Sequence, residues 1–214
     1  YKNKKEKLMK IFKFFLGAML LILSTSSMAE VKFMKNTVPH YHQFDNVPEG
    51  VYACGHTALK EAAKYVSGID KSLKDLHSTM WYNAAIYRNK TCKPNYCARL
   101  LDLDYAARLS QNNGYGLKNS IRRTVGDYAT LLQKVKDGVQ HDLPPVAESR
   151  WDVSFGHFYV IVGYEDTGDA ENSILYLRDV LESSPIHEKY DTMTTVKNFH
   201  DHMQTQQLLF VKRN

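Results

Sequence analysis

The chain has 214 residues, of which 43% are hydrophobic and 12% aromatic, and its formal net charge at pH 7 is +5. This length fits one globular domain with a sizeable core, and the composition argues against intrinsic disorder, a collagen-like fold or a disulfide-dense miniprotein. The first 29 residues hold six of the 28 basic residues and one of the 23 acidic ones, which leaves 22 of each in residues 30–214. Because the remaining chain is formally neutral, we expect no nucleic-acid partner.

Residues 1–29 have the three-part layout of a secretory signal peptide with an upstream extension. Two lysines precede an apolar run over residues 14–23, and a polar stretch follows that ends in Ser27-Met28-Ala29. The apolar run is about half of the roughly 20 residues that a membrane-spanning helix needs. We therefore expect cleavage before Glu30 and export into the periplasm or the medium of a bacterium, with no stable membrane anchor afterwards. An uncleaved amphipathic or buried helix is the alternative.

The remainder, Glu30–Asn214, has no repeat or linker that would divide it, so we expect one domain. Its first half carries helical patterns, in which small and apolar residues recur at helical spacing. Gly68 and Gly138 are the expected stops of two of these helices. The predicted helices cover residues 58–66, 72–80, 97–109 and 127–136.

Strand patterns follow Gly138. They are rich in β-branched and aromatic residues, and they cover residues 144–148, 158–162 and 174–177. Residues 163–173 contain Asp166-Thr167-Gly168-Asp169, a composition typical of a turn. A helix over 195–203 and a strand over 207–211 complete the chain. Helices followed by an antiparallel sheet predict an α+β fold.

The chain has three cysteines, an odd count that leaves one unpaired: Cys54, Cys92 and Cys97. Pro94 and Asn95 between the last two favour a turn, which could bring their Cα atoms within disulfide distance. In an exported protein such a bridge is permitted, so we predict a Cys92–Cys97 disulfide. Half of a zinc site is the alternative, but no second ligand pair stands at suitable spacing. Cys54 is then the free thiol.

Cys54 stands directly before the helical pattern over 58–66, where the positive end of the helix dipole and free backbone N–H groups favour a thiolate. Nucleophilic sulfur chemistry also needs a base, and that base needs a group to orient it. A structural thiol at a strand-to-helix junction is the alternative.

His157 is the candidate base, since it opens the predicted strand 158–162. A hairpin centred on Gly168 would place His157 opposite Asp179, where a hydrogen bond is feasible if both side chains share a face. A slip of one residue would turn Asp179 to the other face. A surface histidine and a surface aspartate on a hairpin are the alternative.

Gln43, upstream of Cys54, could donate its side-chain N–H to an oxyanion together with the backbone N–H of Cys54. By itself a glutamine is ordinarily a solvated loop residue. Its significance comes only from the other motifs of the chain.

These motifs together resemble the papain-like cysteine peptidases of the bacteriocin-processing, double-glycine-leader type and their exported relatives, the peptidase C-thirty-nine-like family. The resemblance runs from Val38 to Val211 and rests on the segments Val-Pro-x-x-x-Gln, Ala-Cys-Gly, Pro-Val, Gly-His-Phe-Tyr-Val-Ile-Val-Gly-Tyr and a strand ending in Asp. It implies a papain-like cysteine protease fold with N-terminal helices packed on a C-terminal antiparallel sheet. It also matches one residue to each role: Gln43 to the oxyanion hole, Cys54 to the nucleophile, His157 to the base and Asp179 to the orienting group.

Two positions depart from the family pattern. His56 stands where the family often has Pro after Cys-Gly, which leaves open whether it assists, tunes or only packs. Val180 follows Asp179 where the family often has Pro, so Asp152 remains a second candidate for the orienting group.

We therefore expect an exported cysteine peptidase that acts on peptide or protein substrates. Acyl transfer to an amine from the same site and a non-catalytic peptide-binding module are the alternatives. We expect no metal and no other cofactor. The pairs His40/His42 and His200/His202 could each present two imidazoles on one face of a strand, as the start of a metal site, but His200 and His202 lie in a predicted helix, where residues two apart do not face each other.

Overall fold

The computed structural model describes residues 29–45, 53–76, 99–109, 114–152, 156–182 and 187–214. Within these ranges, helices and strands mix as an α+β fold predicts. The helices are α2 (Cys54–Ser67), α4 (Leu100–Arg108), α5 (Tyr128–Gln140) and α6 (Val196–Asp201). The strands are β1 (Glu30–Phe33), β2 (Ile121–Thr124), β3 (Pro145–Ser149), β4 (His157–Asp166), β5 (Ile174–Asp179), β6 (Thr192–Thr195) and β7 (Gln207–Phe210).

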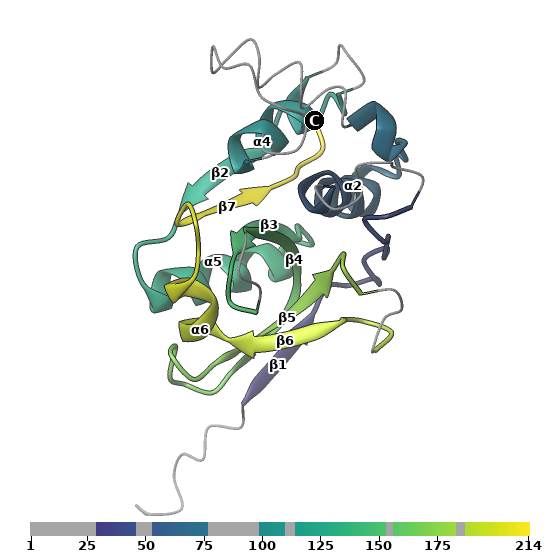
Figure 1. Cartoon of the computed structure of the whole chain (residues 1–214). Coiled ribbons are helices and arrows are strands. Elements are labelled where there is room, and N and C mark those ends of the chain that lie inside the picture. The colour runs from purple at the N-terminus through teal and green to yellow at the C-terminus, as the bar shows by residue number, and fades with distance from the viewer. Residues whose placement is uncertain (1–28, 46–52, 77–98, 110–113, 153–155, 183–186) are drawn as a thin grey trace, which may run out of the picture.

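The described strands form one antiparallel sheet in the order β2-β7-β3-β4-β5-β6, and β1 joins it by pairing with β4 (Figure 1). Strand β4 is the centre of this sheet. One of its edges pairs with β3 near His157 and with β1 near Asp166, while its other edge pairs with β5. Its first eight residues are buried. Burial on both faces explains why this strand is a continuous apolar run and not an alternating one.

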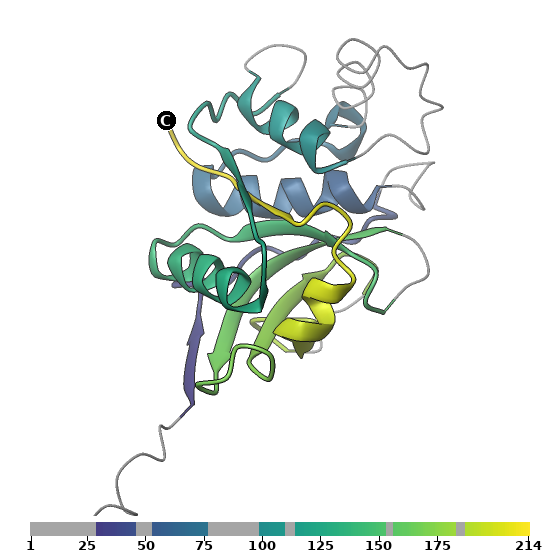
Figure 2. The same cartoon turned by 90° about the vertical axis from the view of Figure 1, so that its left-hand side faces the viewer.

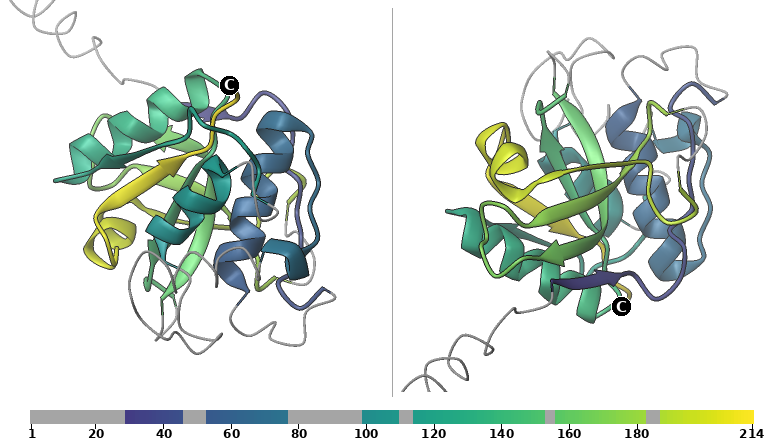
Figure 3. Two further views of the ribbon diagram at one scale, coloured as in Figure 1. Left: turned by 90° about the horizontal axis from the view of Figure 1, so that it is seen from above. Right: turned by 90° about the horizontal axis from the view of Figure 1, so that it is seen from below.

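Two groups of helices flank the sheet. Helices α2 and α4 pack against each other, and α2 also packs on β4 and β3 (Figures 1 and 2). Helix α5 packs on β4 and on α6, away from α2 in the views along the vertical (Figure 3). The expected stop of the first helix is confirmed, because Gly68 has a left-handed φ of 75° and its N–H donates to the Lys64 carbonyl at 2.8 Å.

Helix α5 begins as its sequence suggests and ends later than expected. The Asp127 side chain caps it by accepting the Thr130 N–H at 2.7 Å. The predicted stop at Gly138 is wrong, because the helix continues to Gln140. A Cβ at Gly138 would lie 2.9 Å from the ring of Phe210, so this glycine serves close packing and not helix termination.

The hairpin formed by β4 and β5 differs from the expected one. Strand β4 continues to Asp166, so the predicted turn over 163–173 is too long. Tyr159, and not His157, lies directly opposite Asp179. The pairing of β4 with β5 also changes register once, between Ile161 and Gly163. The offset at Asp179 is two residues. Because side chains alternate with a period of two, His157 and Asp179 still share a face.

Three strands have no counterpart in the sequence-based prediction, namely β1, β2 and β6, each four residues long. Of the predicted helix over 72–80, residues 73–76 are helical and the rest lie outside the described residues. The predicted Cys92–Cys97 disulfide and residues 1–28 of the predicted signal peptide also lie outside them. In the part of the chain that the structure describes, no helix is both long and apolar enough to cross a membrane.

Gly163 is the point at which β1 approaches β4 most closely. A Cβ there would lie 2.5 Å from Phe33 Cδ1 and 2.7 Å from the Lys32 carbonyl oxygen, and backbone atoms of a paired strand cannot easily move away. We expect Gly163→Ala to lower the free energy of unfolding by about 1–3 kcal/mol, as overpacking does. Urea denaturation measures it.

Gly126→Ala is the matched control, since no atom lies within 4 Å of a Cβ at that position. Its effect should not exceed about 1 kcal/mol in either direction. Equal stability of the two variants would contradict the close approach of β1.

Candidate active site

Cys54 is the first residue of α2, as its sequence context suggests. The preceding residue, Ala53, offers no side-chain cap to the helix. The turn is tightened at Thr57, whose N–H and hydroxyl both donate to the Ala53 carbonyl at 2.9 Å. The Cys54 residue is 8% exposed. The thiol therefore sits at the positive end of a helix dipole, in a largely dry environment.

His157 and Asp179 meet across the hairpin. His157 opens β4, Asp179 closes β5, and the imidazole Nε2 donates to Asp179 Oδ1 at 2.8 Å. The two residues are diagonal neighbours, a separation that only a long side chain can bridge, and the far ring nitrogen makes the contact. Oδ1 also accepts the Leu181 N–H at 2.9 Å. Tyr159 packs edge-on against the imidazole, with ring centroids 4.7 Å apart.

Cys54 acts on the same imidazole. Burial lowers the pKa of His157, but hydrogen bonding and charge from Asp179 and Cys54 outweigh it and raise the pKa to about 9. Since Nε2 faces Asp179, Nδ1 is the nitrogen left for the sulfur. Nδ1 makes no close, well-aligned hydrogen bond to any described residue. Such looseness is usual in cysteine–histidine sites without substrate.

Gln43 is brought beside the third member of this group by the main chain. Its N–H donates to the carbonyl of Val180, the residue after Asp179, at 2.9 Å. The residue is 1% exposed, and its Oε1 accepts no hydrogen bond from any described residue. Its side chain has no hydrogen bond to Cys54 or to His157. The structure thus places the main chain of Gln43 beside Val180, next to Asp179.

Comparison with known proteins agrees with this arrangement. The model of the Peptidase_C39 like family matches residues 35–208. The chain belongs to this peptidase family. Among solved structures, UfSP from C. elegans is similar with a TM-score of 0.53 at 11% sequence identity, over 90% of this chain and 36% of that one. At this identity the likeness shows the fold alone, and it confirms the predicted papain-like fold. No curated protein matches.

Asp152 does not orient His157. Its carboxylate accepts the Tyr159 hydroxyl instead, and burial, the largest influence, raises its pKa. Of the two candidates, only Asp179 hydrogen-bonds the imidazole.

The remaining histidines of the sequence analysis are dispersed. His56 is buried in the first turn of α2. His40 lies 3.1 Å from a carboxylate oxygen of Asp191, whereas His42 contacts the Leu181 carbonyl at 3.2 Å. Within the described ranges, no three His, Cys, Asp or Glu side chains are grouped to hold a metal ion.

Two buried carboxylates were missed by the sequence analysis. Asp191 precedes β6, and its Oδ2 accepts the Asp179 N–H at 2.9 Å. Glu61 lies on α2 and is fully buried. It stands two helical turns after Cys54, and that spacing was the available signal that both lie on one face.

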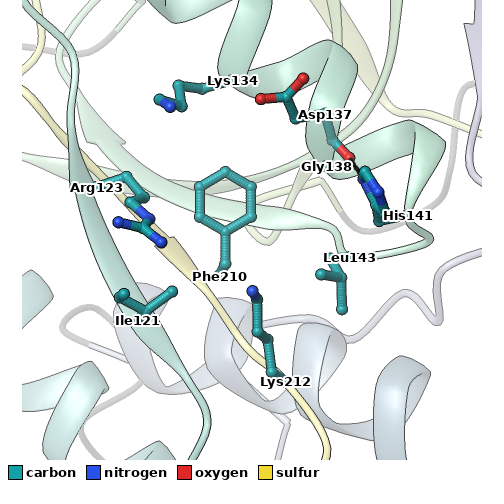
Figure 4. Close-up of a pocket in the computed structure, with 9 residues that line it drawn as sticks. All are labelled: Ile121, Arg123, Lys134, Asp137, Gly138, His141, Leu143, Phe210 and Lys212. Atoms are coloured by element: carbon teal, nitrogen blue, oxygen red, sulfur yellow. Dashed lines mark hydrogen bonds between the residues drawn. The ribbon is translucent and has the colours of Figure 1, made fainter.

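A separate hollow of about 390 Å³ lies away from this site (Figure 4). At one end of β3, Ser149 pairs with His157. At the other end, Pro145 pairs with Phe210, and Phe210 lines the hollow. The hollow is therefore not a part of the candidate active site. Its lining residues are Ile121, Arg123, Lys134, Asp137, Gly138, His141, Leu143, Phe210 and Lys212.

Asp179 is one of the groups that keep His157 protonated, so its charge can be tested directly. We expect Asp179→Asn to lower the pKa of His157 below its native value of about 9, because burial then acts with less opposition. Titration of the imidazole followed by NMR measures this. The native contribution of the imidazolium to stability should be complete below pH 6.5 and be lost as the pH rises through about 9.

Asp152→Asn is the control for this measurement, since Asp152 binds Tyr159 and not the imidazole. Its effect on the pKa of His157 should be the smaller of the two. The reverse order would assign the orienting role to Asp152.

Proposed function

We propose that this family member is an exported cysteine peptidase that hydrolyses peptide bonds with Cys54, His157 and Asp179. The observation that carries the proposal is the 2.8 Å hydrogen bond between His157 and Asp179, made by an imidazole whose pKa Cys54 also raises. Cys54, His157 and Asp179 would then serve as the nucleophile, the base and the orienting group of a thiol hydrolase. Gln43 and the Cys54 N–H are the proposed oxyanion donors.

The first half of the reaction breaks the peptide bond. Before attack the proton of the Cys54 thiol resides on His157 Nδ1, and the thiolate sulfur attacks the carbonyl carbon of the substrate. The carbonyl oxygen gains negative charge, which the Gln43 amide and the Cys54 N–H stabilise. Nδ1 then gives its proton to the leaving amine as the carbon–nitrogen bond breaks, which leaves a thioester on Cys54.

The second half returns the enzyme to its starting state. Water attacks the thioester while His157 Nδ1 accepts one of its protons, and collapse of the intermediate releases a carboxylic acid and the Cys54 sulfur. Asp179 remains ionised throughout, because its role is to orient the imidazole and to stabilise the imidazolium. With a pKa of about 9, His157 is protonated at neutral pH, and an imidazolium beside sulfur favours a thiolate nucleophile.

Alkylation and digestion test the chemistry. The chain from Glu30 onward should react stoichiometrically with iodoacetamide at Cys54 near neutral pH, and mass spectrometry of a digested peptide mixture in ¹⁸O water should show one labelled oxygen at each new carboxyl terminus. We expect Cys54→Ala to remove both alkylation at that position and cleavage, by about 1000-fold or more in rate.

An alkylation-inert Cys54 in the folded protein would contradict an activated thiol. Substrate joined to an added amine, with no labelled acid, would show acyl transfer in place of hydrolysis. Cleavage unchanged by Cys54→Ala would assign the activity to another residue.

Export is the second element of the proposal. Strand β1 begins at Glu30, so cleavage before that residue would leave the sheet intact. We expect a bacterium expressing the full chain to release a product whose N-terminal residue is Glu30, as measured by fractionation and mass spectrometry. A product that stays in the cytoplasm with residues 1–29 attached would contradict it.

A further inference from the structure

A second group of charged side chains is buried behind Asp179. Asp191, Glu61 and Arg178 are each at most 1% exposed. Arg178 Nη1 donates to Asp191 Oδ1 at 2.8 Å, and His40 Nδ1 lies 3.1 Å from Asp191 Oδ2 and 3.9 Å from Glu61 Oε1. Burying charge is costly unless each group is paired, so this cluster needs a reason.

The contacts of the two ring nitrogens of His40 bear on which of them carries a proton. Nε2 lies 2.9 Å from the Glu182 carbonyl oxygen, which only accepts, so Nε2 carries a proton. Nδ1 faces the carboxylate of Asp191, which stays ionised because His40, Arg178 and the Asp179 N–H outweigh burial and lower its pKa. The nearby carboxylate of Asp191 is the main influence that raises the pKa of His40, although Nδ1 is not aligned for a hydrogen bond with a described residue.

The cluster joins three of the four parts of the chain that carry the proposed catalytic groups. Glu61, on the helix of Cys54, accepts the Tyr41 N–H at 2.8 Å from the segment that leads to Gln43. Arg178 Nε donates at 3.2 Å to the Val38 carbonyl at the start of that segment. Asp191 accepts the N–H of Asp179 itself.

From these contacts we infer that Asp191 and His40 form a second carboxylate–imidazolium pair that positions Asp179 and the Gln43 segment for the proposed reaction. They are positioning residues, because neither contacts Cys54 or the His157 ring. The inference rests on the proposed function of Cys54, His157 and Asp179. The groups facing His40 are Asp191, Glu61 and Arg178, and burial raises the pKa of Glu61 well above its ordinary value.

The expected size of the effect follows from the geometry. If the pair is lost, Asp179 keeps its bond to His157, but the side chain that accepts its main-chain N–H is no longer held in place from the His40 side. A displacement of about 1 Å near a reacting group can cost about 100-fold in rate. Asp191→Asn removes the negative charge between Arg178 and His40, and His40→Gln removes the positive charge while leaving the Asp191–Arg178 pair in place.

Two readouts separate positioning from a merely structural role. One is the rate of Cys54 alkylation by iodoacetamide as a function of pH. The other is the downfield NMR resonance of the His157 Nε2 proton, assigned by its loss in His157→Asn. We expect both variants to fold, to lower the alkylation rate at pH 7 by about 10- to 100-fold, to shift the midpoint of the pH profile, and to move or broaden the resonance.

His141→Gln is the matched control, since His141 is exposed and lines the hollow at the far end of β3. It should leave both readouts unchanged. The melting temperature of each variant reports its folding. His40→Gln keeps the test decisive if Asp191→Asn alone fails to fold.

The inference is overturned if folded variants keep the native alkylation rate, pH profile and His157 resonance, or if both variants unfold, which would make the cluster purely structural. Failure of the proposed function gives a different result. In that case wild-type Cys54 resists alkylation, while the His157 resonance still responds to Asp191 and His40.

Discussion

The hydrogen bond between His157 and Asp179 is the interaction on which the proposed chemistry depends. It exists because β4 and β5 pair as a hairpin, and β4 also packs on α2, the helix that begins at Cys54. Pairing with β3 fixes the other edge of the same strand, at the contact of Ser149 with His157. The imidazole is therefore held from both sides of its strand, while the sulfur reaches it from a helix about one hundred residues earlier in the chain.

The parts of this arrangement that the sequence predicts are those that local physics controls. Dipole and small residues mark the helix that begins at Cys54, and the apolar run from Phe158 marks the central strand. The predicted pairing of β4 with β5 was wrong by two residues, and an even number keeps His157 and Asp179 on the same face of the sheet. An error of one residue would have placed them on opposite faces. The register change between Ile161 and Gly163 lies where β1 pairs with β4, at Gly163. No local sequence pattern encodes that contact.

The buried charges show the opposite case. A glutamate flanked by lysines on an amphipathic helix indicates a solvated face, yet Glu61 is buried because a distant backbone N–H, that of Tyr41, needs an acceptor there. Asp191 has no distinguishing neighbours in sequence, and its partners Arg178 and His40 come from two other segments. Such a cluster is defined only in three dimensions, because each member is satisfied by residues remote in the chain.

The change of register within β4 divides the strand into two halves that pair with different neighbours. The half from His157 to Ile161 pairs with β3 and with the end of β5. The half from Gly163 to Asp166 pairs with β1 and with the start of β5. A protein engineer could therefore lengthen the loop between Asp166 and Ile174, for example to insert an affinity tag or a reporter peptide, while the spacing of the reacting groups stays unaltered.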